Sequence, residues 1–256
     1  MNLKKMAAAG LSVVVLAGLA GCGGSQDKAA DKKAESDLSG QVTASGSSAL
    51  LPLAKDAAAK FKAENPKVSL TLNAGGSGTG LKQVSEGSVD IGMSDVFAEE
   101  KLPAEKAKEL VDHKVCVITM APIVNKDVGA AVKNLTKAQI QDIFTAKVTN
   151  WKDVGGPDEP IVLVTRPSTS GTRALFTKYA MDGKEEASNK SLETDDSGTL
   201  IQSISQTKGA IGYVALSYLV NNKDVATVAI DGQGATRGRG TDAGKYLQRQ
   251  VSGLGL

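Results

Sequence analysis

The sequence predicts an α/β fold with largely parallel sheets. Short apolar runs that are typical of strands, such as 161–164 and 210–214, alternate along the chain with helical sequence such as 51–64. Of the 256 residues, 41% are hydrophobic and 23% are charged, which is ordinary for a globular protein with a sizeable core. Because ligands of such sheets bind beyond the carboxyl ends of the strands, we expect a site in the turns that follow the strands.

The first 21 residues are expected to be a signal peptide. A basic start at Lys4-Lys5 is followed by the apolar stretch 6–19, which is too short to cross a membrane as a helix. The stretch ends in Leu19-Ala20-Gly21-Cys22, which resembles the lipobox of bacterial lipoproteins. We therefore expect cleavage after residue 21 and lipidation of Cys22, which anchors the protein on the extracytoplasmic face of a bacterial cell membrane. A plain secretory signal with a chance cysteine is the alternative.

Residues 22–40 are expected to form a flexible linker behind this anchor, because they are small or charged and show no hydrophobic period. The mature chain is expected to be nearly neutral. Removal of Lys4 and Lys5 lowers the 30 basic residues to 28, which equals the number of acidic residues. Aromatic residues make up only 4%, so the chain lacks both the basic stripe and the stacking surfaces of a nucleic-acid-binding protein.

The second cysteine, Cys116, lies in the apolar run 115–118. If Cys22 carries lipid, Cys116 has no disulfide partner, and no C-x-x-C motif indicates redox chemistry. We expect Cys116 to be buried and to pack as a small hydrophobic side chain.

The folded region repeats the order strand, turn, helix. The expected strands are 41–44, 68–72, 89–95, 115–124, 161–164 and 210–214. The expected helices are 51–64, which ends before Pro66, a helix beginning near 81, 104–112, 136–144, a helix after residue 170, and 200–205.

Three turns between a strand and a helix are rich in hydroxyl groups and glycine. They are Ser45-Gly46-Ser47-Ser48, Gly75-Gly76-Ser77-Gly78-Thr79-Gly80 and Arg166-Pro167-Ser168-Thr169-Ser170-Gly171-Thr172-Arg173. The second turn is neither a GxGxxG motif nor a P-loop, and we expect its glycines to let the backbone approach a ligand. The strand 89–95 ends differently, in the carboxylate of Asp95.

The turn 166–173 has the chemistry of an anion site. Ser170 is a natural N-cap, so the backbone N–H groups of Gly171 and Thr172 lie at the positive end of a helix dipole. Such an end binds anions. Arg166 adds a guanidinium that can bind two oxygens of one tetrahedral oxyanion. An ordinary capped helix after a serine-rich turn is the alternative.

Together these motifs resemble the phosphate-binding proteins of bacterial phosphate ABC transporters. The matching motifs are Gly46-Ser47-Ser48-Ala49, Gly76-Ser77-Gly78-Thr79-Gly80, Gly92-Met93-Ser94-Asp95, Arg166 with Ser170-Gly171-Thr172, and Gly209-Ala210-Ile211-Gly212-Tyr213-Val214. The resemblance implies the two-lobed type 2 periplasmic-binding-protein fold, in which each lobe is a mostly parallel sheet flanked by helices and the ligand lies in the cleft. It also implies a set of phosphate ligands, which are Ser47, Ser48, Ala49, Ser77, Asp95, Arg166, Ser170, Gly171 and Thr172.

The same resemblance implies how the chain is divided and what it does. Residues 41–120 would form lobe 1, 121–214 lobe 2, and 215–256 a segment that returns to lobe 1. The protein would be a monomeric lipoprotein without metal or cofactor that captures inorganic phosphate by hinge closure. It would deliver phosphate to an ABC permease with its ATPase subunits, and would meet the membrane only through its lipid anchor.

Two other functions are compatible with parts of the sequence. Hydroxyl-rich turns and helix N-termini could equally serve a receptor for another tetrahedral oxyanion, such as sulfate or molybdate. Asp95 favours phosphate, because phosphate has a proton to donate to a carboxylate and sulfate has none. A secreted hydrolase fits less well, since His113 is the only histidine and no G-x-S-x-G motif surrounds Ser77. We therefore do not expect an enzyme.

Overall fold

The computed structural model of the chain describes residues 38–234. The expected signal peptide, the lipidation site Cys22, most of the linker and the last part of the expected return segment lie outside the described residues. None of the described helices has the length and apolar character needed to cross a membrane.

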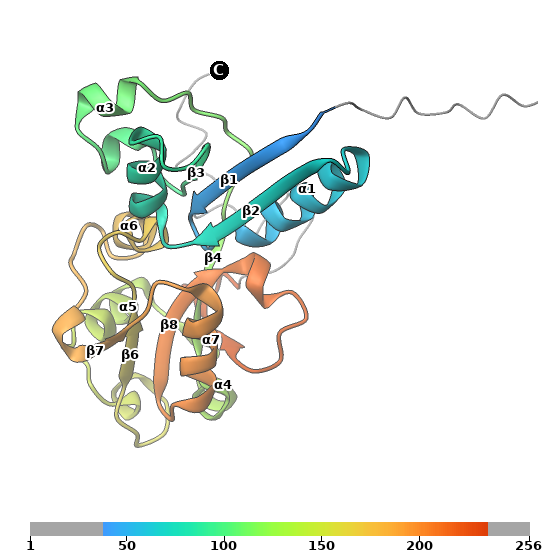
Figure 1. The fold of residues 1–256 in the computed structure, drawn as a ribbon. Helices are drawn as coiled ribbons and strands as arrows, with labels where there is room; N and C mark the ends of the chain where they lie inside the picture. Colours follow the sequence, from blue (N-terminus) through green and yellow to red (C-terminus); the bar gives the residue numbers. More distant parts are fainter. Residues whose placement is uncertain (1–37, 235–256) are drawn as a thin grey trace, which may run out of the picture. The chain divides into compact units, whose positions relative to one another are not determined.

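The first sheet is parallel throughout, with β1 (Gly40–Gly46) between β2 (Val68–Ala74) and β3 (Ile91–Met93). Helix α1 (Leu51–Glu64) follows β1 and packs along β2, and α2 (Ser77–Ser85) follows β2 and contacts β3 (Figure 1). The three strands end side by side, because Gly46 is paired with Ala74 on one side and with Met93 on the other. The turns that follow the strands therefore begin at the same edge of the sheet.

Gly46 is required at this edge by close contact between strands. Its φ is 136°, and a Cβ atom there would collide with the carbonyl group of Met93. Only glycine tolerates both conditions, which lets β1 and β3 end next to each other.

The connection from β3 to the second sheet differs from the expectation. It contains η1 (Ala98–Glu100) and α3 (Ala104–Lys108), which is shorter than the expected helix, and strand β4 begins only at Met120 (Met120–Val124). The expectation that Cys116 is buried in a strand is wrong, because the residue is exposed and lies in irregular structure. Residue 120 is where pairing with β8 begins, at Ala215, and an apolar run forms a strand only where a neighbour accepts its backbone hydrogen bonds.

The second sheet has five strands in the order β7-β6-β8-β4-β9. Strand β6 (Val162–Thr165) pairs in parallel with β7 (Ser191–Glu193) and β8 (Ala210–Ala215), whereas β4 is antiparallel to β8 and to β9 (Ala226–Thr227). Its helices are α4 (Lys126–Ala131), α5 (Lys137–Phe144), α6 (Gly171–Tyr179) and α7 (Ser197–Gln206), with the short helices η2 (Trp151–Val154), η3 (Ser188–Lys190) and η4 (Leu216–Leu219). Strands β5 (Asn134–Leu135) and β10 (Ala229–Ile230) form a separate parallel pair.

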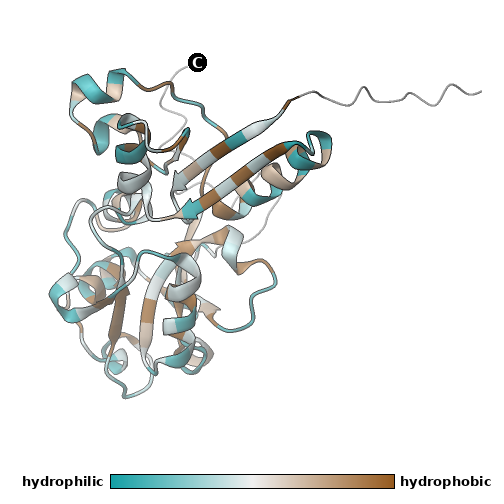
Figure 2. Ribbon diagram, viewed as in Figure 1, coloured by the Kyte–Doolittle hydropathy of each residue, from teal (hydrophilic) through white to brown (hydrophobic). Residues whose placement is uncertain are grey.

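The larger core lies on this second sheet. Strand β6 is hydrophobic along its length (Figure 2), and Leu163 and Val164 in it are buried. On one side the rings of Phe144, Phe176 and Tyr213 pack together, with Phe176 and Tyr213 stacked at a centroid distance of 4.0 Å. This stack joins α6 to β8 and so fixes the helix that carries the turn 166–173.

The described part of the expected return segment, 215–234, pairs with strands of the second sheet through β9 and with β5 through β10. It also contacts the first sheet's turn, since Tyr218 Oη donates a hydrogen bond of 2.7 Å to the carbonyl of Ser48. The lobe boundaries expected after residues 120 and 214 remain predictions.

Candidate functional site

The carboxyl edge of the first sheet brings three of the expected residues into contact. Ser47 Oγ, in the turn after β1, donates a hydrogen bond to Asp95 Oδ1. The backbone N–H of Asp95, after β3, donates to Ser77 Oγ at the start of α2, at 3.0 Å. Ser47 and Ser77 are buried. Three turns that are distant in sequence therefore form one polar cluster, because the three strands that they follow end side by side.

The N-terminus of α6 packs against this cluster. Thr172 Oγ1 donates a hydrogen bond of 2.9 Å to Asp95 Oδ2, so the carboxylate accepts one hydroxyl on each oxygen. Ser170 is the N-cap of the helix, and its Oγ accepts the N–H of Arg173. Gly171 allows the close approach, because a Cβ atom there would collide with Ser77 Oγ and lie 2.9 Å from Asp95 Cβ.

Arg166 is fully buried beside this cluster. Its Nη1 donates to the carbonyl of Asp195 at 3.0 Å and its Nη2 to Ser197 Oγ at 2.9 Å. Ser48 Oγ lies 3.5 Å from Nη1 and 3.0 Å from Ser197 Oγ. Arg166 Nε has no hydrogen-bond partner in the described part of the chain. A buried guanidinium with an unused donor has capacity for an anion.

Burial and charge act against each other at the two ionised groups. Burial raises the pKa of Asp95, while the hydroxyls of Ser47 and Thr172 and the charge of Arg166 partly lower it again. Burial lowers the pKa of Arg166, and the nearby groups Tyr213, Asp195 and Asp95 oppose that shift. The charge of each group therefore partly offsets the effect of burial on the pKa of the other.

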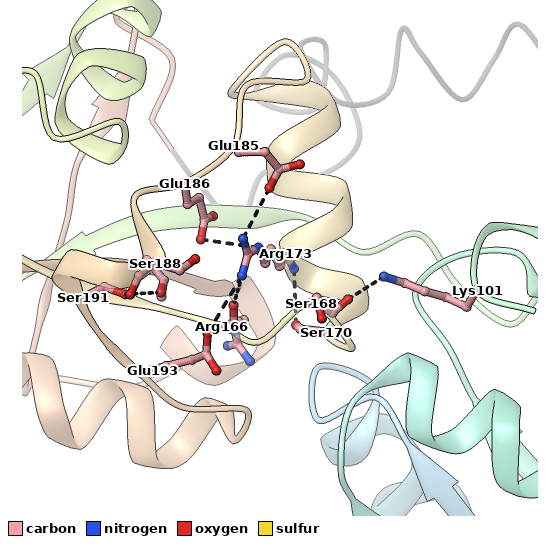
Figure 3. A network of polar contacts seen from close by, with 11 residues as sticks. Lys101, Arg166, Ser168, Ser170, Arg173, Glu185, Glu186, Ser188, Ser191 and Glu193 are labelled. Carbon is pink, nitrogen blue, oxygen red and sulfur yellow. Dashed lines mark hydrogen bonds and ion pairs between the residues drawn. The ribbon is translucent and has the colours of Figure 1, made fainter.

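Further contacts tie the segments of the first sheet to the turn 166–173. Lys101 Nζ donates a hydrogen bond of 2.8 Å to the carbonyl of Ser168 (Figure 3), and the N–H of Gly78 donates one of 2.9 Å to the carbonyl of Thr169. These two bonds border a cavity of about 420 Å³ that Lys82 and Lys106 also line. The turn is thus held against the first sheet around the polar cluster.

All nine residues expected from the sequence lie at or next to this cluster. Side-chain or close backbone contacts join five of them, which are Ser47, Ser77, Asp95, Gly171 and Thr172, and a separate contact joins Ser48 to Arg166. Ser170 joins through its cap of α6, and Ala49 is buried directly after Ser48 without a side-chain contact to the cluster that we identify. Their roles as ligands remain a prediction.

Two residues of the cluster were missed by the sequence reasoning. Ser197 Oγ and the carbonyl of Asp195 accept hydrogen bonds from Arg166. Both belong to Asp195-Asp196-Ser197-Gly198-Thr199, which follows β7, and the side chain of Asp196 caps α7. This is a fourth polar, glycine-containing turn between a strand and a helix, so the pattern used for the other three would have found it.

The groups of the cluster are of the kinds that bind an anion. The cluster combines hydroxyl donors, a buried guanidinium and the N-terminal turns of α2 and α6 with one carboxylate acceptor. No group of histidine, cysteine, aspartate or glutamate in residues 38–234 could hold a metal ion. The single histidine, His113, is exposed in the irregular connection before β4.

Comparison with known proteins agrees with this arrangement. A family model described as the PBP superfamily domain matches residues 31–253. The phosphate-binding protein PstS of Bacillus subtilis (strain 168) is 54% identical over 200 residues, which are 78% of this chain and 65% of the relative. The phosphate-binding protein PstS of Staphylococcus epidermidis is 29% identical over 228 residues, covering 87% of this chain and 68% of the relative. The chain thus spans about two thirds of the length of these relatives.

Solved structures give the same result. One is a crystal structure from Clostridium perfringens with bound phosphate, described as a phosphate ABC transporter substrate-binding protein. It has a TM-score of 0.69 and 33% identity, and the match covers 83% of this chain and 82% of that chain. An ABC-type phosphate transport receptor from Vibrio cholerae has a TM-score of 0.54 and 26% identity. The match covers 75% of this chain and 77% of that chain. The α/β fold and the resemblance seen in the sequence are confirmed. The chain belongs to the PBP superfamily, in the family of the phosphate-binding proteins of phosphate ABC transporters.

Proposed function

We propose that this chain is a solute-binding protein that captures inorganic phosphate and delivers it to an ABC permease. The observation that carries the proposal is that a buried arginine, Arg166, and a carboxylate, Asp95, lie near enough for each charge to affect the other's pKa, among hydroxyls and helix N-termini. The arginine and the N-termini attract a tetrahedral oxyanion. The carboxylate selects an oxyanion that carries a proton.

Asp95 distinguishes phosphate from sulfate. At neutral pH phosphate has at least one proton, which it can donate to the carboxylate in a charge-assisted hydrogen bond. Sulfate would place lone pairs against the same group, and the charges would repel each other. A buried acceptor that loses its donor discriminates strongly, by about 10⁴-fold or more in well-built sites.

The relatives support the same ligand. The Bacillus and Staphylococcus proteins are named phosphate-binding proteins, and the Clostridium structure contains phosphate. The transport role is also proposed from these relatives, whose names include an ABC transporter substrate-binding protein and a transport receptor. From the signal-peptide and lipobox motifs of the sequence we propose an extracytoplasmic location with Cys22 as the lipid anchor. We also propose a permease with ATPase subunits as partners, and a monomeric state.

Isothermal titration calorimetry of the mature chain with phosphate, sulfate and molybdate tests the ligand. We expect micromolar or tighter binding of phosphate, which corresponds to about 8 kcal/mol and is within reach of several charge-assisted hydrogen bonds. Stronger binding of sulfate or molybdate than of phosphate would refute the assignment and favour a receptor for another oxyanion. Release of phosphate from an added phosphate ester would instead support a hydrolase.

The anchor is tested separately in cells. The Cys22→Ser variant should lose its lipid, and it should either leave the membrane fraction or keep an uncleaved signal peptide with a changed mass, because cleavage and acylation both need the cysteine thiol. Membrane-bound protein of unchanged mass in this variant would contradict lipidation at Cys22.

A further inference from the structure

A second arginine, Arg173, lies directly behind the anion site. It is the third residue of α6, and its side chain is only 13% exposed. Its Nη1 donates a hydrogen bond of 2.7 Å to the backbone carbonyl of Arg166. Figure 3 shows the guanidinium turned back from the helix toward the start of the turn 166–170. The side chain therefore joins the two ends of this turn.

Three carboxylates surround the same guanidinium (Figure 3). Glu185 lies 3.4 Å from Nη2, Glu186 lies 3.8 Å from Nε, and Glu193 lies 3.9 Å from Nη1. The side chain of Glu186 is completely buried, and burial raises its pKa to about 7. A planar guanidinium held on several edges has little rotational freedom. Since carboxylates compensate its charge locally, its main contribution is direction rather than attraction of an anion.

Arg166 is positioned from both sides by α6. Arg173, in the first turn of the helix, holds its backbone carbonyl. Phe176, about one turn later, stacks on Tyr213, and the Arg166 guanidinium lies 5.9 Å from the centre of that Tyr213 ring. The first turn of α6 thus holds the Arg166 backbone, and the next turn packs on the Tyr213 ring of β8 that lies beside the Arg166 side chain.

We propose that Arg173 is a positioning residue for anion binding, which acts by holding the Arg166 backbone so that the Arg166 guanidinium is already directed into the site. This inference rests on the proposed function, because it concerns the same anion. Without Arg173 the turn 166–170 would lose the link between its first residue and α6. Arg166 would then have to be ordered when the anion binds, which lowers affinity.

The test is a set of phosphate titrations that includes a double-mutant cycle. Arg173→Met keeps much of the side-chain length and removes the hydrogen bond, and we expect about tenfold weaker phosphate binding. Arg173→Lys can keep one hydrogen bond to the Arg166 carbonyl, and its affinity for phosphate should lie between those of Arg173→Met and the parent. Lys178→Met removes a positive charge from the exposed end of the same helix and is the matched control, with affinity within about twofold of the parent.

The cycle separates positioning from general loss of structure. If Arg173 acts through Arg166, the Arg173→Met change should lower the affinity for phosphate by about threefold or less in an Arg166→Lys background, because the directed guanidinium is already missing there. An equal loss in both backgrounds, or parent-like affinity of Arg173→Met, would overturn the proposal. If Arg173→Met does not fold, Arg173→Lys is measured in both backgrounds and the same comparison decides.

The outcome for the parent protein distinguishes this inference from the proposed function. A parent that binds sulfate but not phosphate refutes the phosphate assignment, and the cycle is then measured with sulfate. A parent that binds neither anion refutes both proposals. If the parent binds phosphate and the effects of the Arg173 and Arg166 substitutions on its affinity are additive, only the positioning role of Arg173 is refuted.

Discussion

The carboxylate of Asp95 should decide which anion this protein accepts, and the change Asp95→Asn tests it with little change in shape. In the structure each carboxylate oxygen accepts one hydroxyl, from Ser47 and from Thr172. An amide can still accept on its oxygen, but its NH₂ group can also donate. The variant therefore converts a pure acceptor into a group that tolerates a ligand without protons.

The size of the effect follows from two contributions. A charge-assisted hydrogen bond between phosphate and Asp95 contributes about 1.5–3 kcal/mol. In phosphate the donated proton lies between the anion and the carboxylate and offsets their repulsion, whereas sulfate leaves that repulsion in place, at about 4 kcal/mol for two unit charges about 4 Å apart at the effective dielectric constant of such sites. Together they amount to about 6 kcal/mol, or a preference for phosphate of about 10⁴-fold in the parent.

We expect Asp95→Asn to narrow this preference by about 100-fold or more, chiefly because sulfate gains affinity once the repulsion of about 4 kcal/mol is removed. Calorimetric titration of both anions into parent and variant measures the two affinities. Asp90→Asn is the matched control, because Asp90 lies directly before β3, at the end of the strand opposite to Asp95, and its carboxylate accepts hydrogen bonds from Thr43. A parent that binds sulfate as well as phosphate, or an unchanged ratio in Asp95→Asn, would refute the reasoning.

The stability of the ligand-free protein gives an independent check, because Asp95 should favour phosphate binding but lower the stability of the fold. Because burial raises the pKa of Asp95, its ionisation is harder in the folded than in the unfolded chain, and the ionised group lowers stability above its ordinary pKa. Without ligand, the Asp95→Asn variant should therefore melt at or above the temperature of the parent at neutral pH. A clearly lower melting temperature would mean that Asp95 serves mainly to hold the fold together.

Three further predictions concern other parts of the site. Arg166→Lys should weaken phosphate binding by about tenfold or more despite its conserved charge, since lysine cannot bind two oxygens in a fork, and titration would reveal a parent-like affinity if this is wrong. Lys101→Met removes the hydrogen bond to the Ser168 carbonyl and should weaken binding about twofold to fivefold, mainly by faster release in stopped-flow experiments. For Glu186, whose pKa is raised from 4.5 to about 7, the parent's free energy of unfolding should fall as the pH rises between these values. Melting curves of Glu186→Gln at several pH values should lack this part of the decline.

Much of the site could be predicted because its residues follow strands that run in parallel. Such strands end at one edge, so hydroxyl-rich turns that are distant in sequence are expected to meet there. The level ends of β1, β2 and β3 bring Ser47, Ser77 and Asp95 together in this way. The N-cap at Ser170 was also predictable, because a capping serine and its helix are neighbours in the chain.

The rest depends on contacts that no local pattern contains. The bond between Thr172 and Asp95 joins residues that are 77 positions apart, and it requires the N-terminus of α6 to lie against the edge of the first sheet. The misplaced strand around Cys116 has a related cause. The run 115–124 is apolar apart from Thr119, but only its second half pairs with β8, and residues 115–119 stay irregular, with 115–117 exposed.

The positions of the hydroxyl protons extend the argument for selectivity beyond Asp95 itself. A hydroxyl group has one proton, and Ser47 and Thr172 both donate theirs to the carboxylate. Their remaining lone pairs can then only accept a hydrogen bond. Ser77 differs, because its Oγ accepts the N–H of Asp95 and keeps its own proton for a ligand. Asp95 thus turns two neighbouring hydroxyls into acceptors, which strengthens the demand for a protonated anion. In Asp95→Asn only the amide oxygen still accepts, so one of these hydroxyls is free to rotate and donate, which is a second reason why sulfate should bind the variant better.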